Sequence, residues 1–408
     1  MDYILDFHND LTHWLESEIK KHQHLLKWDG IDISKPIFNF LWYTHLKDRD
    51  DYIQYRRGHP DSKFFSETHI DIPKGTPALT NMIHRDLISH PWREILQNEA
   101  GKIIIYADSN RRLKYLMPII SDISAPALII TRSYDIPEEI LKQSNIKILP
   151  LVLLKSKTVV SSGLSVLSTY LTSYIHTLYC YIHWLQPRQI ICCDGCQTQY
   201  QLAAIFGKKL STESICYQFG WPGYIHAGFQ NLPYTKFFTW ADKYSDLMSP
   251  YNPGVKFEAK GRLGKVETTG SHDCISFFLQ APIFVSSEQY LSELHDAIIS
   301  TSKRYPNRTI IVRPHPEAEI ERDILQRFEK YRNIEINSKD KIEDIYRRTV
   351  ISVSQYSSCL VESELFGCNP ICYNPTHGYT YDALSSGRQV QSISQLLDLI
   401  AKFMRHEI

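Results

Sequence analysis

Two apolar runs that stop abruptly at polar residues constrain the fold of this chain more than any other feature. Thr309-Ile310-Ile311-Val312 leads directly into Arg313-Pro314-His315-Pro316, and Val350-Ile351-Ser352-Val353 leads into Ser354-Gln355-Tyr356-Ser357-Ser358. Short β-branched runs of this kind predict buried strands of a parallel sheet. In an open parallel sheet, polar residues that follow the strands lie at the carboxyl edge, where ligands bind.

The same alternation of apolar runs and helical segments continues along most of the chain. It predicts strands at 103–106, 127–130, 146–154, 189–193, 275–279, 309–313, 334–336, 350–354 and 370–373. At 408 residues the chain exceeds the size of one ordinary hydrophobic core. We therefore predict an α/β fold of two Rossmann-like domains facing each other across a cleft, at 1–255 and 265–408, with a turn-rich linker within 250–273. Residues 10–28 are expected to form a helix capped by Asn9 or Asp10, and residues 29–100 irregular structure with short helices.

Bulk composition excludes several classes of protein. Lys+Arg and Asp+Glu are both 45, and zero net charge argues against nucleic acid as a partner. The odd number of cysteines, 9, and an N-terminus without signal-peptide features favour reduced thiols and a cytoplasmic location. The most apolar segments are about 10 residues long, too short to cross a bilayer, so any attachment to the inner face of a membrane would be peripheral.

Known catalytic motifs are absent, and no metal is expected. The sequence contains no P-loop, no G-x-G-x-x-G, no H-E-x-x-H and no G-x-S-x-G. The pair Cys193-x-x-Cys196 has no second Cys or His pair at the spacing of a zinc site.

The motif Arg313-Pro314-His315-Pro316 is the sharpest candidate for chemistry. Its two prolines fix the backbone on either side of the histidine and so limit the freedom of the ring. A histidine held at a strand end could donate a hydrogen bond to a phosphate or a ribose, and a departing phosphate needs such donors. The alternative is a strand-to-helix turn in which the histidine is incidental.

Ser357 and Ser358 predict the start of a helix, and Gly367 predicts its end. A capping hydroxyl and a bound phosphate use the same geometry at a helix N-terminus, so both roles are compatible. Glu362, about one turn later, could accept hydrogen bonds from ribose hydroxyls or could be an ordinary helix carboxylate.

Asp194-Gly195 follows the strand expected at 189–193. A carboxylate at this strand tip could act as a general base or as a nucleophile. Asp-Gly is also a frequent turn dipeptide, and both interpretations stay open. The segment Tyr217–Tyr224, rich in glycine and aromatic residues, could bind an acceptor or could be a packed loop.

The second half of the chain resembles the carboxyl-terminal domain of GT-B glycosyltransferases of bacterial capsule, O-antigen and teichoic acid synthesis. The pieces that carry the resemblance are Gln280-Ala281-Pro282, His315-Pro316, Lys341-Ile342-Glu343-Asp344-Ile345, Tyr356-Ser357-Ser358 and Gly367-Cys368-Asn369-Pro370. Capsule β-Kdo transferases and polysialyltransferases are similar in having a His-Pro motif and a Ser/Thr motif that bind the CMP of the donor. Their acidic-acidic-Gly motif corresponds here to Cys193-Asp194-Gly195, in which the first acidic residue is missing. CDP-glycerol-dependent teichoic acid polymerases are more distantly similar.

This resemblance implies a metal-independent GT-B enzyme without a cofactor. The enzyme would transfer a sugar acid, Kdo or sialic acid, from a CMP-activated donor to an oligosaccharide or glycolipid acceptor of capsule or O-antigen lipopolysaccharide. It could associate with the membrane periphery or with an export complex. The implied catalytic residues are Asp194 and His315, and the implied CMP-binding residues are Gln280, Arg313, His315, Pro316, Ser357, Ser358 and Glu362.

Three other functions remain as alternatives. One is a CDP-glycerol or CDP-ribitol phosphotransferase of teichoic-acid-like polymer synthesis. The second is a non-catalytic subunit that binds a nucleotide or a glycan. The third is an epimerase built on the same two domains.

Overall fold

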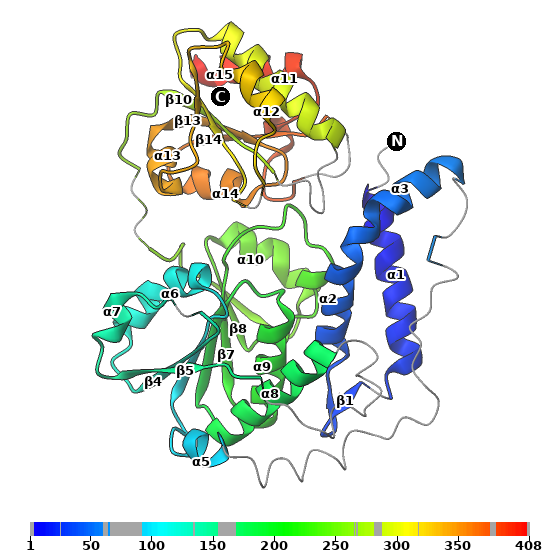
Figure 1. Ribbon diagram of the computed structural model, residues 1–408, viewed down its shortest axis with the longest axis vertical. Helices are drawn as coiled ribbons and strands as arrows, with labels where there is room; N and C mark the ends of the chain where they lie inside the picture. Colours follow the sequence, from blue (N-terminus) through cyan, green and yellow to red (C-terminus); the bar gives the residue numbers. More distant parts are fainter. Residues whose placement is uncertain are drawn as a thin grey trace.

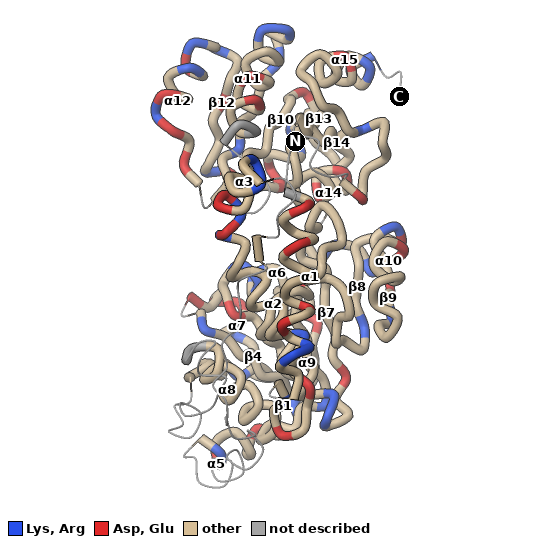
Figure 2. The backbone as a smooth tube through the Cα atoms, turned by 90° about the vertical axis from the view of Figure 1, so that its right-hand side faces the viewer, with Lys and Arg blue, Asp and Glu red and all other residues tan. Residues whose placement is uncertain are grey.

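The chain forms two parallel α/β sheets, one in each half of the sequence (Figure 1). The computed structural model describes residues 4–24, 26–59, 64–65, 92–133, 135–153, 169–264, 266, 268–280, 288–316, 318–375 and 381–405. In Figure 1 the lobe of the second half, coloured yellow to red, lies above the lobe of the first half. Residues of both charge signs occur in both lobes (Figure 2).

The first sheet has seven strands in the order β5-β4-β3-β6-β7-β8-β9, and every neighbouring pair is parallel. The strands are β3 (Ile103–Tyr106), β4 (Ala127–Thr131), β5 (Ile146–Pro150), β6 (Gln189–Cys193), β7 (Glu213–Tyr217), β8 (Lys236–Thr239) and β9 (Lys256–Ala259). The helices of this half are α5 (Trp92–Gln97), α6 (Asn110–Asp122), α7 (Glu138–Leu141), α8 (Thr169–Leu185), α9 (Thr198–Lys209) and α10 (Asp242–Met248).

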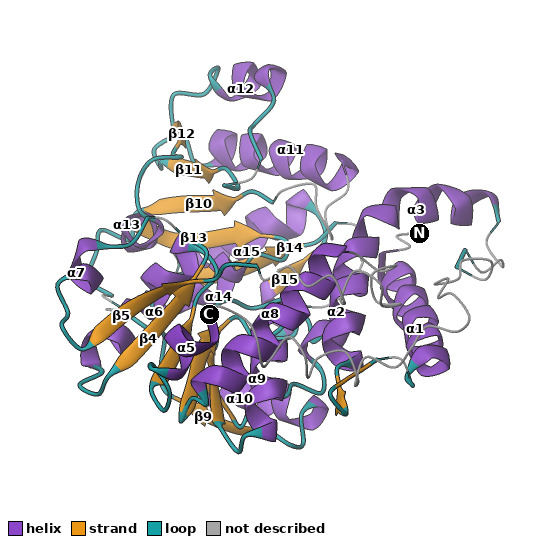
Figure 3. Cartoon of the chain, turned by 60° about the horizontal axis from the view of Figure 1, so that its bottom comes forward, coloured by secondary structure: helices purple, strands orange, loops and turns teal. Residues whose placement is uncertain are grey.

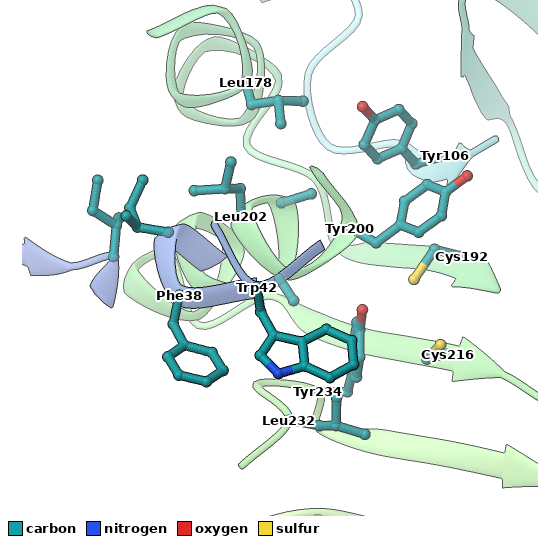
Figure 4. Packing of buried hydrophobic residues seen from close by; sticks show 14 of the residues in the cluster. Phe38, Trp42, Tyr106, Leu178, Cys192, Tyr200, Leu202, Cys216, Leu232 and Tyr234 are labelled. Carbon is teal, nitrogen blue, oxygen red and sulfur yellow. The ribbon is translucent and has the colours of Figure 1, made fainter. Parts of the chain in front are cut away.

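Alternation along the central strands divides the first core between the two faces of the sheet. Ile104 and Tyr106 of β3 belong to one buried cluster, whereas Ile103 and Ile105 belong to another. Successive strand residues point to opposite faces, so a strand apolar at every position must be covered on both sides. Figure 4 shows the first face, where Trp42 packs beside residues of the sheet and of α9.

The second sheet has six parallel strands in the order β12-β11-β10-β13-β14-β15. They are β10 (Cys274–Phe278), β11 (Ile310–Arg313), β12 (Ile334–Ile336), β13 (Thr349–Ser354), β14 (Asn369–Tyr373) and β15 (Gln389–Val390). The helices are α11 (Glu288–Arg304), α12 (Arg322–Phe328), α13 (Ile342–Arg348), α14 (Ser358–Leu365) and α15 (Ile393–Met404).

Three N-terminal helices stand together beside the first lobe (Figures 1 and 3). They are α1 (Ile4–His22), α2 (Ser34–His45) and α3 (Arg49–Gly58), with a small hairpin of β1 (Lys27–Trp28) and β2 (Ile31–Asp32) between the first two. Helix α2 packs against α9 of the first lobe. Among the helices in the described part of the chain, none combines the length and apolarity that a membrane crossing requires.

The strands expected at 103–106, 189–193 and 334–336 are confirmed, whereas three other expectations are wrong in part. The helix expected at 10–28 spans Ile4–His22, so Asn9 and Asp10 lie inside it and do not cap it. Asp10 instead accepts hydrogen bonds from Tyr52 (2.7 Å) and Arg56 (3.3 Å) and so ties α1 to α3. The predicted linker contains β9, whose pairing with β8 extends the first sheet to Ala259. The strand expected at 146–154 ends at Pro150, and residues 154–168 lie outside the described part.

In each sheet the chain adds strands first on one side and then on the other, so the strand order reverses at one point. From β3 the chain passes through α6 to β4 on one side, and from β6 it passes through α9 to β7 on the other. In the second sheet the reversal falls between β10 and β13. At such switch points neighbouring helices diverge, which is where ligands of open α/β sheets bind.

Candidate functional site

Asp194 follows β6 at the switch point of the first sheet, in a strained backbone conformation. Its φ is +82°, and that of Gly195 is +59°. Left-handed backbone costs a non-glycine residue about 1–3 kcal/mol and is concentrated at functional sites. A Cβ on Gly195 would lie 2.8 Å from Cε2 of Phe237, so only glycine fits this turn without a shift of the ring. The Asp-Gly turn and the end of β6 are therefore one feature, in which Asp194 is partly buried.

Arg112, on the first turn of α6, joins the carboxylates that follow the two central strands. Its Nε and Nη2 donate to Oδ2 of Asp194 at 3.2 and 2.5 Å, and its Nη1 donates to Oδ1 of Asp108 at 3.0 Å. Asp108 also accepts from the Tyr200 hydroxyl (2.6 Å) and from Nε2 of Gln199 (2.5 Å). This network fixes the position of the Asp194 carboxylate.

The two oxygens of Asp194 have different surroundings. Oδ2 receives both bonds from Arg112, while Oδ1, among the described residues, accepts only from the weakly donating Cys196 thiol, at 3.6 Å. Burial raises the pKa of the Asp194 carboxyl, and Arg112 opposes part of that rise. Oδ1 therefore keeps the lone-pair capacity that a base or nucleophile needs.

Ser357 and Ser358 both lie at the start of α14 but do different things. The Ser357 hydroxyl caps the helix by accepting from the Cys359 amide at 3.2 Å. The Ser358 hydroxyl accepts from the Trp221 amide (3.0 Å) and donates to the Trp221 carbonyl (3.2 Å). Trp221 follows β7 of the first sheet, so Ser358 joins the carboxyl edges of the two sheets.

The Trp221 loop is packed. Trp221 is 3% exposed and Gln218 is 2% exposed. The side-chain oxygen of Gln218 accepts from the Trp240 amide at 2.9 Å, which holds the start of the loop against β8. The segment was expected either to bind an acceptor or to form a packed loop, and the burial of these two residues agrees with a packed loop.

Glu362 lies in an ion pair with an arginine that follows β9. Nη2 of Arg262 is 3.4 Å from Oε2 of Glu362 and 3.0 Å from Oε1 of Glu343 on α13. Burial raises the pKa of Glu362 to about 7, although Arg262 and Arg111 oppose the rise. A role for Glu362 in ribose binding stays a prediction.

The remaining candidates lie at the carboxyl edge of the second sheet. Nε2 of Gln280 donates to the Ser354 hydroxyl at 3.3 Å, and Nη1 of Arg313 donates to the Asn337 carbonyl at 2.8 Å. His315 is half-buried and Pro316 is exposed, directly after β11. Because β10 separates β11 from β13 and neighbouring strands are ~4.8 Å apart, His315 and Ser357 follow strands about 10 Å apart.

The sequence analysis missed four residues of this region: Asp108, Arg111, Arg112 and Arg262. Asp108-Ser109-Asn110-Arg111-Arg112 follows the buried strand at 103–106, the same pattern that singled out Arg313–Pro316. That pattern was a usable signal for the first three. For Arg262 no local signal exists, because its partners lie 81 and 100 residues away. Within the described part of the chain, no group of three or more His, Cys, Asp or Glu could hold a metal ion.

Comparison with known proteins identifies the fold. No protein-family model matches the sequence, and no curated protein sequence matches it. A UDP-GlcNAc 2-epimerase from Neisseria meningitidis, solved with bound UDP-GlcNAc, is 12% identical over 75% of this chain and 92% of that chain, with a TM-score of 0.50. A Listeria monocytogenes protein to which UDP-N-acetylglucosamine 2-epimerase activity is ascribed is 7% identical over 75% of this chain and 88% of that chain, also with a TM-score of 0.50.

The wall teichoic acid polymerase TagF is 9% identical over 80% of this chain and 88% of that chain, with a TM-score of 0.45 that is too low to support an inference. The two epimerase structures, at such low identity, speak for the fold alone. Together with the order and direction of the strands, they show that the chain adopts the GT-B arrangement, two Rossmann-like domains facing each other across a cleft.

Proposed function

We propose that the protein is a glycosyltransferase that moves a sugar acid, Kdo or sialic acid, from a CMP-activated donor to a bacterial surface glycan. One observation carries the proposal: the carboxyl edges of the two sheets meet through Ser358 and Trp221. The Asp194 carboxylate follows a strand on one side of this junction, and Gln280, His315 and Ser357 follow strands on the other.

The second domain would hold the nucleotide. Transfer breaks the bond between the sugar carbon and a phosphate oxygen, and CMP leaves with the negative charge. The N-terminus of α14 carries the positive end of the helix dipole, and His315 would add a donor at the same sheet edge. Because these groups stabilise the leaving phosphate, the reaction as proposed requires no metal.

The first domain would act on the acceptor. Oδ1 of Asp194 would either remove the proton of the incoming hydroxyl or attack the donor carbon, while Arg112 holds Oδ2. A base gives inversion of the anomeric configuration, and a nucleophile gives retention through a covalent adduct. The NMR spectrum of the product made from one defined donor distinguishes the two outcomes.

The acceptor would be an oligosaccharide or glycolipid of capsule or O-antigen. Such an acceptor is assembled at the inner face of the membrane, so we place the protein in the cytoplasm with peripheral contact to that surface or to an export complex. Separation of cell extracts into soluble and membrane fractions, with and without a salt wash, tests this location.

Titration with CMP-sialic acid, CMP-Kdo, CDP-glycerol and UDP-sugars, followed by turnover of every donor that binds, tests the proposal. His315→Ala should lower turnover by about 10²–10³-fold, the usual effect of losing one preorganised donor. Asp194→Asn should remove turnover and leave donor affinity unchanged. Near-normal turnover in both variants refutes the proposal. Consumption of CDP-glycerol identifies a phosphotransferase, and binding without consumption of any donor identifies a non-catalytic subunit.

A further inference from the structure

Two adjacent arginines at the start of α6 have opposite surroundings. Arg112 is paired with Asp108 and Asp194. Arg111 is exposed, and it forms no ion pair with any residue in the described part of the chain. Its guanidinium carbon lies 5.0 Å from the centroid of the Phe219 ring, a cation–π distance. The charge of Arg112 is neutralised by two carboxylates, whereas Arg111 is held over an aromatic ring without an acidic partner among the described residues.

A cation at the position of Arg111 is unfavourable for the helix itself. Ser109 caps α6, and the first turn contains no acidic residue. The positive end of the helix dipole favours carboxylates in this turn and disfavours arginine. Arg111 thus departs from the usual charge preference of a helix start, and such departures concentrate at functional sites. The dipole and the guanidinium together favour an anion at this place.

Arg111 acts on the second domain as well as on the first. Burial raises the pKa of Glu362 on α14, and Arg111 opposes that rise together with Arg262. Glu362 already has Arg262 as its ion-pair partner at 3.4 Å. Arg111 also precedes Arg112, which holds Asp194. Arg111 also lies over the ring of Phe219, two residues before Trp221, whose amide donates to Ser358 at the start of α14. These contacts place Arg111 near the proposed phosphate site on α14 as well as near the proposed catalytic carboxylate.

We propose that Arg111 determines donor specificity by binding the negatively charged group that the donor carries beyond its first phosphate. This inference rests on the proposed function and deepens it. The CMP phosphate is taken by the second domain, so the group left for Arg111 is the carboxylate of the sugar acid. In a CDP-linked donor the same cation would take the second phosphate instead.

Calorimetric titration of the full chain with CMP, CMP-sialic acid and CDP-glycerol tests the inference. Arg111→Gln should weaken CMP-sialic acid binding by about 10–100-fold, the range for losing a charged hydrogen-bonding partner, and leave CMP binding unchanged. Lys114→Gln is the matched control, since it removes an exposed cation one turn further along α6 and should alter neither affinity. Arg111→Lys keeps the charge and should retain part of the preference for CMP-sialic acid over CMP.

The outcomes are separable from those of the proposed function. A selective loss for CMP-sialic acid identifies the carboxylate, and a selective loss for CDP-glycerol identifies the second phosphate; both support Arg111 as the anion receptor. Equal affinities of wild type and Arg111→Gln for all three ligands overturn the inference, as does an equal loss for CMP and CMP-sialic acid. Failure of the wild type to bind any of the ligands overturns the proposed function and the inference with it.

Discussion

Arg112 and Asp194 lie 82 positions apart in sequence, and loss of their ion pair should destabilise the first domain. Arg112→Met keeps most of the apolar volume of the side chain and removes the guanidinium. Two hydrogen bonds to Asp194 and one to Asp108 disappear. The two side chains are only 19% and 16% exposed, so water replaces these bonds incompletely.

The expected loss in the free energy of unfolding follows from how far the Arg112–Asp194 pair is buried. Breaking a fully buried ion pair by removing one partner costs about 3–5 kcal/mol. Because both Arg112 and Asp194 keep some contact with water, we expect about 2–3 kcal/mol for Arg112→Met at pH 7. Asp194→Asn removes the charge that needs the guanidinium. The double variant should therefore cost about 2 kcal/mol less than the sum of the two single variants.

Urea denaturation followed by tryptophan fluorescence gives the free energies for this cycle.

The destabilisation by Arg112→Met should depend on pH in a defined direction. Burial already raises the pKa of Asp194, and loss of Arg112 raises it further. A carboxyl whose folded pKa is raised contributes stability below its unfolded pKa of about 3.9, and that contribution is lost as the pH rises through the folded pKa. The cost of Arg112→Met should therefore grow between about pH 4 and pH 7. Equal costs at both ends of this range, or a coupling energy below about 0.5 kcal/mol, would refute the reasoning.

Three further predictions concern neighbouring parts of the junction. Because burial raises the pKa of Glu362 to about 7, its contribution to stability is full below the unfolded pKa and is lost as the pH rises through about 7. In urea titrations, the free energy of unfolding of Glu362→Gln should therefore rise relative to that of wild type by up to about 3 kcal/mol between pH 4.5 and pH 8. A difference that does not depend on pH would contradict this. Gly195→Ala should cost about 2–4 kcal/mol in thermal or urea unfolding, from left-handed backbone plus a Cβ 2.8 Å from the Phe237 ring, and a neutral effect would show that the ring yields freely. Ser358→Ala leaves the Trp221 amide without its partner at the domain junction and should cost about 1–2 kcal/mol and increase proteolytic cleavage near residue 221; unchanged cleavage would show that other contacts hold this loop.

Local pattern was sufficient for the strands and for some of the site. The strands at 103–106, 189–193 and 334–336 were predicted with their observed bounds. The first two are mainly apolar runs, and the third alternates as Ile334-Glu335-Ile336. The end of α14 was also predicted: Gly367 has a φ of +87°, and its amide donates to the Glu364 carbonyl. The bounds of α1 were not predicted, because Asp10 looks like a helix cap until Tyr52 and Arg56 are seen to bind it.

The sequence by itself determined that the chain has two parallel α/β sheets and that polar groups follow their central strands. A buried strand has a characteristic pattern of apolar residues within a few positions, so it can be recognised without knowing which strand it pairs with. Only the tertiary structure decided which polar groups meet: Arg112 with Asp194, Arg262 with Glu362, and Ser358 with Trp221. These contacts join residues 82, 100 and 137 positions apart, and their geometry follows from how the strands are ordered and the domains are packed, which no local pattern encodes.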